Sequence, residues 1–402
     1  MTITTEVSPQ SSDSQGDKIF WWNDPRIRGF ILQGAMLLAV VLVFSTAIYT
    51  ANSNLDNHHN ARGFGFLDNR AGFDLAQALV DYPKDATYGR ALLVGFLNTA
   101  LVAVFGILFA TILGFIAGIA RLSKNAVIST IAMVYVETVR NVPLLLQMLF
   151  WYVGVLQVLP APRNSFQPIT GSVFLNNRGL FIPQVSFTGM TGWGILFGLV
   201  LGIVAAVIMS KWATARQLRT GAQFPAFWVG LALILALPII GFVITGANYT
   251  TNFPIKSTFN LSGGMRVIPE FMALVLALTL YTGVFIAEIV RSGILSVSYG
   301  QSEACHALGL TNGQTLRLVV IPQAMRVIIP PLTNQYLNVT KNSSLAVAIG
   351  YPDLVYVGGT VLNQSGQAIE VIALWMLVYL GTSVTTATLM NWYNQRNAIV
   401  ER

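Results

Sequence analysis

Residues 298–322, SYGQSEACHALGLTNGQTLRLVVIP, form a polar, glycine-punctuated stretch between two long apolar runs. Ser298 and Gln301 have the spacing of a capping box, in which each side chain bonds the other's backbone N–H. The pattern therefore predicts a short helix that begins at Tyr299. Gly309 is a typical C-terminal cap, because glycine readily adopts the left-handed backbone that ends many helices.

A second capping box follows, formed by Thr311 and Gln314, and it predicts the start of the next helix. The first helix would carry small or apolar side chains on one face, from Ala304, Ala307 and Leu308. Glu303 and His306 would point elsewhere. Two short helices joined at a glycine, between membrane spans, indicate a protruding element that could dock to a partner. The alternative is an ordinary loop with a capped helix.

The composition is that of an integral membrane protein. Of the 402 residues, 54% are hydrophobic and only 10% are charged, whereas soluble domains carry roughly 25% charged residues. We interpret the net charge of +7 as the basic excess of cytoplasmic loops. Nucleic-acid binding is the weaker alternative, because the basic residues are scattered along the chain.

Catalytic and metal-binding motifs are missing from the sequence. A single cysteine excludes an intrachain disulfide, and the three histidines lack a ligand spacing such as HExxH. His58 and His59 lie among Asn and Asp, in what we interpret as a solvated loop. No lysine follows a glycine, so a Walker A motif cannot be written. We therefore expect a chain that is no enzyme, does not hydrolyse ATP and carries no cofactor or metal.

Eight apolar runs punctuate the chain and predict an all-α, polytopic bundle of about eight transmembrane helices. They cover 29–49, 92–120, 128–159, 193–209, 227–245, 267–289, 327–349 and 369–389. The third is interrupted by Glu137, Arg140 and Pro143, and the seventh contains Pro330 and Pro331. The polar segments between the runs are interpreted as loops.

Charge asymmetry predicts the orientation. Eight spans place both termini on the same side, and the basic residues concentrate there, as in the connection with Lys211, Arg216 and Arg219. The opposite side carries sparse pairs such as Arg163 and Arg178. Because cytoplasmic loops are the basic ones, we expect both termini and the 298–322 segment to be cytoplasmic.

The 298–322 segment resembles the "EAA" loop of permease subunits of ATP-binding-cassette (ABC) importers. That pattern is Glu-Ala-Ala, three residues, Gly, nine residues, Ile or Val, one residue, an apolar residue and Pro. The spacing matches throughout, with Cys in place of the second Ala. The resemblance implies a coupling helix that enters a groove of the ATPase. Its coupling residues would be Glu303, Ala304, Cys305, Ala307, Leu308, Gly309 and Pro322.

Further stretches resemble the polar-amino-acid branch of these permeases, the histidine/glutamate type. They are YVETVRNVPLLLQ at 135–147, FIAEIVR at 285–291, LNVTKNSSLA at 337–346 and IGYPDL at 349–354. The extra first span and AGFD at 71–74 resemble the general L-amino acid permease subgroup. The resemblance implies a type I ABC-importer permease fold in the bacterial inner membrane. It also implies a second homologous permease, a cytoplasmic ATPase dimer holding ATP and Mg, and a periplasmic amino-acid-binding protein.

On this interpretation the chain divides into four parts. Residues 1–28 are a cytoplasmic tail, 29–90 hold the first span and a periplasmic loop, and 391–402 are a second cytoplasmic tail. Residues 91–390 form the permease domain, with an inserted helical pair near 191–246.

Two Glu-x-x-Arg pairs stand near the expected cytoplasmic ends of spans. Glu137 with Arg140, and Glu288 with Arg291, are spaced i,i+3, so each pair shares a helix face. A charge near lipid is costly unless it is paired or faces protein or water. Each pair therefore either orients a helix end or contacts the ATPase or the coupling helix.

A polar run interrupts the seventh span at Lys341, Asn342, Ser343 and Ser344. Transporters place substrate sites at broken helices near the bilayer midplane, so this run is a candidate translocation path. The alternative is an interface with the partner permease, since Ser and Asn often join membrane helices. Three further acids, Glu270, Asp353 and Glu370, lie near the expected outer ends of spans and are interpreted as solvated loop residues. The alternative is that they meet the binding protein or gate the path.

Three alternatives to an ATP-driven amino acid importer stay open at this point. An ion-coupled secondary transporter would require an unpaired carboxylate or cation site at mid-membrane, whereas the acids here cluster near span ends. A membrane scaffold or receptor would not require the polar interruption. An ABC permease for another small polar solute is also possible, because the coupling motif does not specify the cargo.

Overall fold

The protein is described by a computed structural model that covers residues 25–57, 63–222, 224–257 and 260–397. It divides into two units, residues 1–63 and 64–402, which are treated separately. In the first, α1 (Pro25–Asn57) contains the run predicted at 29–49. Most of the predicted tail at 1–28, the His58–His59 pair and residues 398–402 lie outside the described residues.

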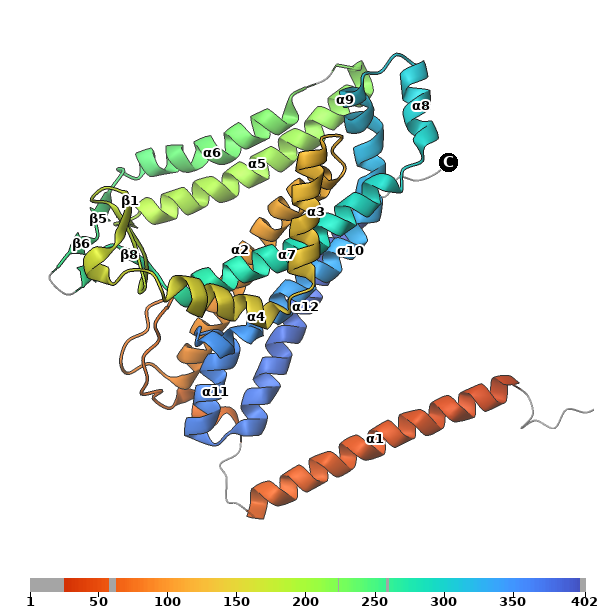
Figure 1. Cartoon of the computed structure of the whole chain (residues 1–402). Helices are drawn as coiled ribbons and strands as arrows, with labels where there is room; N and C mark the ends of the chain where they lie inside the picture. Colours follow the sequence, from red (N-terminus) through yellow and green to blue (C-terminus); the bar gives the residue numbers. More distant parts are fainter. Residues whose placement is uncertain (1–24, 58–62, 223, 258–259, 398–402) are drawn as a thin grey trace, which may run out of the picture. The chain divides into compact units, whose positions relative to one another are not determined.

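The second unit is dominated by long apolar helices (Figure 1). Six described helices could cross a membrane, and one bent pair raises the number to seven. The six are α2 (Tyr88–Arg121), α5 (Thr191–Thr220), α6 (Ala226–Ile244), α7 (Pro269–Leu295), the continuous segment Asn312–Ile349, and α12 (Ala368–Asn397). Together with α1 they correspond to the eight predicted runs, which confirms the polytopic helical bundle.

The bent pair differs from the continuous run expected at 128–159. It consists of α3 (Ala126–Arg140) and α4 (Leu144–Leu149), which meet at 104°. The physical reason is Pro143, whose ring disfavours helical backbone at the residue before it. A π-helical stretch, Phe150–Leu156, continues α4.

The centre of the second unit is the contact between α2 and α7. Gly114 and Gly118 on α2 leave room for the backbone of α7 to approach closely. A Cβ added at Gly118 would lie 2.7 Å from the carbonyl oxygen of Ala287. Small residues at one face let membrane helices pack at short range, so these glycines explain why α2 and α7 lie side by side.

The pair α5 and α6 packs mainly on itself, and most of its outer side chains are exposed. A Cβ at Gly202 would lie 2.9 Å from the carbonyl oxygen of Leu233, so the two helices approach closely. The basic segment with Lys211, expected to connect two spans, is itself helical, because α5 continues to Thr220. The helix ends only where Gly221 adopts a φ of +70°.

Short strands lie outside the helices of this mainly helical chain. β1 (Phe166–Ile169), β2 (Val173–Asn176), β3 (Gly179–Ile182) and β8 (Met265–Val267) form an antiparallel sheet in that order. β4 (Gln184–Phe187) pairs with β5 (Tyr249–Asn252), and β6 (Ile255–Lys256) with β7 (Leu261–Ser262). The sequence predicts loops in these segments, because their polar and turn residues interrupt the alternation of apolar and polar side chains by which a strand is recognised.

The C-terminal third starts with α8 (Tyr299–Ala307) and α9 (Asn312–Thr315). The second short helix expected here is instead the start of a long one. α9 continues through a π-helical turn, Leu316–Val320, into α10 (Ile321–Asn342), and a 3-10 helix, Ser343–Ile349, follows. α11 (Leu354–Ser365) then packs against α12. The remaining 3-10 turns are Phe64–Asp68 and Pro162–Asn164.

Candidate functional site

The short helix α8 ends in a Schellman motif. The N–H of Leu310 donates to the carbonyl of Cys305 at 3.0 Å, and the N–H of Gly309 donates to the carbonyl of His306 at 2.9 Å. This pair of hydrogen bonds requires a residue in the left-handed conformation, and Gly309 adopts it with a φ of +78°. The predicted helix and its glycine cap are confirmed, and α8 is a defined element with a fixed end.

The N-terminus of α8 corrects one detail of the prediction. Ser298 is the N-cap residue, but its side chain makes no capping hydrogen bond. Gln301 turns the other way, and its Oε1 accepts a hydrogen bond from Nε2 of Gln323 on α10 at 3.4 Å. The side chain expected to close the capping box therefore links α8 to the following span.

One face of α8 is turned away from the rest of the unit. Cys305 is its buried residue, at 5% exposure, whereas Ala304 and Ala307 are exposed and Leu308 is 81% exposed. Glu303 is exposed as well. A helix that presents small and apolar side chains without covering them is the geometry of helix-in-groove recognition.

The second predicted capping box is present. Oγ1 of Thr311 accepts from the N–H of Gln314, while Oε1 of Gln314 accepts from the N–H of Thr311 at 2.9 Å. A π-helical turn, Leu316–Val320, comes next. Pro322 lies exposed at the start of α10, one residue beyond Ile321. A π turn opens the helix by one residue, and proline, which has no N–H, stands where the regular helix resumes.

An ion network that the sequence did not predict joins the C-terminal parts of α2, α3 and α7. Arg121, the last residue of α2, contacts Glu288 of α7 and lies 3.9 Å from Glu137 of α3. The predicted pair of Glu288 with Arg291 is present, with Nε of Arg291 donating at 3.1 Å. The predicted pair of Glu137 with Arg140 is wrong: no ion pair joins them in the described structure, because Glu137 turns toward Arg121.

The polar run in the seventh span coincides with a change of helix type. α10 ends at Asn342, and the 3-10 helix that follows starts at Ser343, which is fully buried. Ser343 donates its hydroxyl to the carbonyl of Thr340, and Ser344 donates to that of Lys341, both at 2.7 Å. Lys341 is exposed and Asn342 is half-buried. The predicted break is therefore present, and Lys341 is the charged group at its edge.

A buried polar cluster, which was not predicted from the sequence, joins α2 to the start of α11. Asn98 on α2 donates to the carbonyl of Pro352 at 2.9 Å, and Thr99 accepts from the N–H of Leu354 at 3.0 Å. Asp353 is fully buried and caps α11 by accepting from the N–H of Tyr356 at 2.8 Å. The interpretation of Asp353 as a solvated loop residue is wrong. Burial raises the pKa of its carboxyl to about 7.

A signal for this cluster was available in the sequence. Asn98 and Thr99 are adjacent polar residues inside the otherwise apolar run 92–120, and polar residues in a span face protein rather than lipid. Their partners at Pro352 and Leu354 are backbone groups of the IGYPDL stretch at 349–354, and no local pattern shows that this stretch packs against α2.

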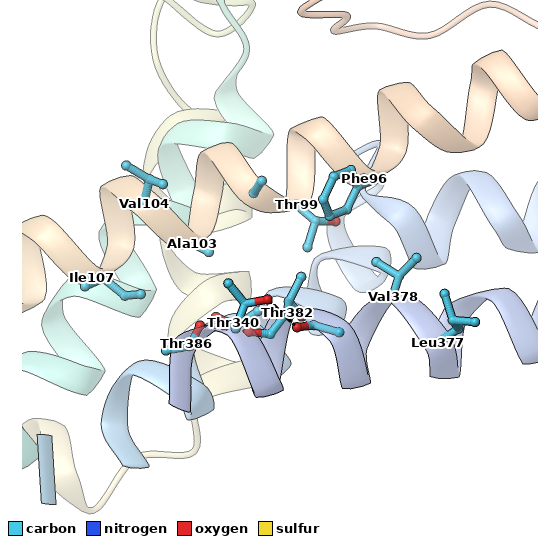
Figure 2. Close-up of a pocket in the computed structure, with 13 residues that line it drawn as sticks. Phe96, Thr99, Ala103, Val104, Ile107, Thr340, Leu377, Val378, Thr382 and Thr386 are labelled. Atoms are coloured by element: carbon cyan, nitrogen blue, oxygen red, sulfur yellow. Dashed lines mark hydrogen bonds between the residues drawn. The ribbon is translucent and has the colours of Figure 1, made fainter. Parts of the chain in front are cut away.

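A cavity of about 510 Å³ lies between α2 and α12, beside the polar break (Figure 2). α2 lines it with Phe96, Ala103 and other apolar side chains, and Thr340 of α10 reaches it. The wall from α12 is rich in threonine, with Thr382, Thr385 and Thr386. Each of these three hydroxyls donates to a carbonyl of its own helix. The cavity thus combines a mainly apolar wall, which includes Thr99 of α2, with a wall of satisfied hydroxyl groups.

Membrane spans, a capped external helix and a broken helix beside a cavity define a transport component rather than an enzyme. Within the described ranges, no cluster of three His, Cys, Asp or Glu residues could hold a metal ion. The chain belongs to the family described as "Binding-protein-dependent transport system inner membrane component", which matches residues 198–397. Family membership favours the importer interpretation over an ion-coupled carrier or a scaffold.

Relatives match almost the whole chain. It is 53% identical to "General L-amino acid transport system permease protein AapQ" of Rhizobium johnstonii, with 94% of both chains covered. It is 47% identical to "Putative amino-acid ABC transporter permease protein YhdX" of Escherichia coli, with 94% of this chain and 96% of the relative covered. It is 41% identical to "Glutamate/glutamine/aspartate/asparagine transport system permease protein BztB" of Rhodobacter capsulatus, with the same coverage.

Proposed function

We propose that this chain is the permease subunit of an ATP-driven amino acid importer in the bacterial inner membrane. Three relatives that match 94% of the chain are named as amino acid transport permeases. The structural observation that carries the proposal is α8, a capped helix with exposed Ala304, Ala307 and Leu308. Such a face requires a groove on a partner, and the ATPase of the importer is that partner.

The remaining assembly follows from the same assignment. A cytoplasmic ABC ATPase dimer binds ATP and Mg, a second homologous permease completes the membrane part, and a periplasmic amino-acid-binding protein delivers the cargo. Both termini are cytoplasmic, with tails at 1–28 and 391–402. Residues 29–90 supply the first span and an outer loop, and 91–390 form the permease domain with its inserted pair near 191–246.

Coupling would pass through the N-terminal turn of α8, which is linked to both α10 and α7. Closure of the ATPases displaces α8, and the Gln301–Gln323 contact transmits that displacement to α10. At the same end of α8, only three residues separate the end of α7 from the start of α8. Because Arg121 and Glu288 tie the end of α7 to α2, these helices move together. The two orientations of the spans are two states of one equilibrium, which the nucleotide shifts.

The translocation path is assigned to the break at Lys341–Ser344 and the cavity beside it. An amino acid zwitterion presents a carboxylate and an ammonium group. The exposed ammonium of Lys341 suits the first, and the carbonyl and hydroxyl oxygens of the polar break suit the second. In this proposal, a displacement that starts at α8 changes the polar break near the C-terminal end of α10.

Uptake of radiolabelled L-amino acids in a host that supplies the partner subunits tests the proposal. The variant is Gly309→Asp, which strains the Schellman motif and places a charge beside the docking face. The matched control is Gly221→Asp, because Gly221 has a similar φ of +70° and an added Cβ would meet no atom within 4 Å at either glycine. Both variants must reach the membrane at the wild-type level.

The expected result is lost uptake and release of the ATPase from membranes for Gly309→Asp, with both retained for Gly221→Asp. Equal loss in the two variants would assign the effect to backbone strain. Full uptake by Gly309→Asp, or uptake without any ATPase, would contradict the proposal.

A further inference from the structure

The small strands form a layer at the end of the unit opposite α8. β8 comes directly before α7 and α8 directly after it. α7 has 27 residues and is therefore about 40 Å long, more than the roughly 30 Å of the hydrocarbon core. The strand layer and α8 lie at opposite ends of α7 in Figure 1, so a cytoplasmic α8 places the strands on the outer side.

This strand layer is basic and contains no acid. The chain has no Asp or Glu between Glu137 and Glu270. Within the layer, four basic residues are all exposed, namely Arg163, Arg178, Lys256 and Arg266. No ion pair joins any of them to an acidic group in the part of the chain that the structure describes.

Two of the arginines are held close to each other. Nε of Arg266 on β8 donates to the main-chain carbonyl of Arg178 at 2.8 Å. Arg178 sits in the turn between β2 and β3, where its own N–H donates to Oδ1 of Asn176 at 2.8 Å. The Arg266 guanidinium is thus fixed at the backbone of a second exposed arginine, and an anionic partner would be attracted to this basic strip.

The surface between the charges has the composition of a protein interface. Phe166, Ile255 and Met265 are about half exposed, at 55%, 66% and 46%. Aromatic residues, Met and Arg are enriched in protein–protein interfaces, whereas Asp and Glu are depleted. Each strand of the β4–β5 ribbon is exposed at all four positions. This arrangement favours a folded protein over lipid headgroups as the partner.

We propose that the layer formed by β1–β8 is the docking surface for an acidic face of the periplasmic binding protein, with Arg163, Arg178, Lys256 and Arg266 as its charged contacts. The inference rests on the proposed importer function and goes beyond it, because it assigns the site and the charge of the contact. Complementary charges of this kind steer encounter and orient the partner.

The test uses the assembled importer in nanodiscs of zwitterionic lipid and, in parallel, of anionic lipid, with the binding protein titrated at low and at high salt. One variant carries Arg178→Glu and Arg266→Glu. A second carries Arg163→Glu and Lys256→Glu, which leaves the Arg266 hydrogen bond in place. The control, Arg219→Glu, changes an exposed arginine of α5 at the end of the hairpin far from β4. Affinity for the binding protein and ATPase activity with and without it are recorded.

Both double variants are expected to bind the binding protein at least about tenfold more weakly at low salt. They should also lose the salt dependence that the wild type shows. Their ATPase activity without binding protein, and all properties of Arg219→Glu, should be those of the wild type. Wild-type affinity in both double variants would overturn the inference, and so would a defect seen only in anionic nanodiscs, which assigns the surface to lipid. A wild-type importer that does not respond to the binding protein would instead overturn the proposed function.

Discussion

Arg121, the last residue of α2, and Glu288, in the C-terminal part of α7, form an ion pair between residues 167 positions apart. The guanidinium side chain is only 12% exposed, and the carboxylate is 25% exposed. Glu288 also accepts from Arg291, and Arg121 lies near Glu137, so one carboxylate stands between two arginines. The pair fixes the end of the helix that leads into α8.

Replacing Arg121 with Gln is expected to lower the free energy of unfolding by about 1 to 3 kcal/mol. The range lies between the values for exposed and for buried pairs, because Glu288 keeps Arg291 as a partner. Thermal unfolding in detergent measures the change. Arg140→Gln is the control, because Arg140 is exposed and has no ion pair in the described part of the chain. Equal unfolding temperatures for the two variants would show that the network contributes nothing.

The left-handed backbone of Gly309 makes a second prediction. Gly309→Ala should destabilise α8 locally by about 1 kcal/mol, because a side chain raises the energy of this backbone region. Space is not the cause, since no atom lies within 4 Å of the added carbon. Hydrogen exchange at Cys305 and its neighbours should rise. Gly313→Ala, inside α9 and equally unobstructed, should be neutral or stabilising. Unchanged exchange in Gly309→Ala would mean that the cap is not required.

Much of the fold could be predicted because membrane spans are encoded locally. An apolar run of sufficient length is enough to identify a span, and a glycine between helical patterns is enough to end one, as at Gly309. The strands were missed because their stability comes from pairing between distant segments. β3 pairs with β8 across more than 80 residues, and no local pattern announces that contact.

The candidate site shows the same division. The face of α8 and the break after Asn342 were predicted, because both depend on residues close in the chain. The partner of Glu137 was not, because helix spacing offers Arg140 while the fold brings Arg121 nearer. The prediction for Asp353 was wrong for a related reason: polar residues before a helix suggest a loop, and only tertiary packing buries them.

Lys341 makes a third prediction, about transport. Lys341→Met should raise the KM for amino acid uptake with little effect on assembly, because the variant removes the cation at the edge of the polar break. Lys341→Arg keeps the charge and should retain part of the activity. Initial uptake rates over a range of substrate concentrations separate KM from the maximal rate. Lys211→Met on α5 is the control for the loss of an exposed lysine. A wild-type KM in Lys341→Met would remove this residue from the path.

The fourth prediction concerns the buried carboxyl of Asp353, whose pKa is raised to about 7 from an ordinary value of 3.8, first of all by burial. Between these two values the folded state binds more protons than the unfolded state, so stability falls as the pH rises and levels off above about 7. The loss can reach about 4 kcal/mol, since one pKa unit corresponds to about 1.4 kcal/mol. Asp353→Asn removes the titration and keeps an oxygen that can accept from the N–H of Tyr356.

Thermal unfolding of the wild type and of Asp353→Asn between pH 5 and pH 8 measures this effect. The wild type should lose stability across the interval, and the variant should change less, because every other titrating group is common to both. The difference between the two curves isolates Asp353, whatever slope the rest of the chain contributes. Parallel curves would show that the carboxyl has the same pKa folded and unfolded. That result would require water or a counter-charge beside its second oxygen, Oδ2, which has no hydrogen-bond partner in the structure.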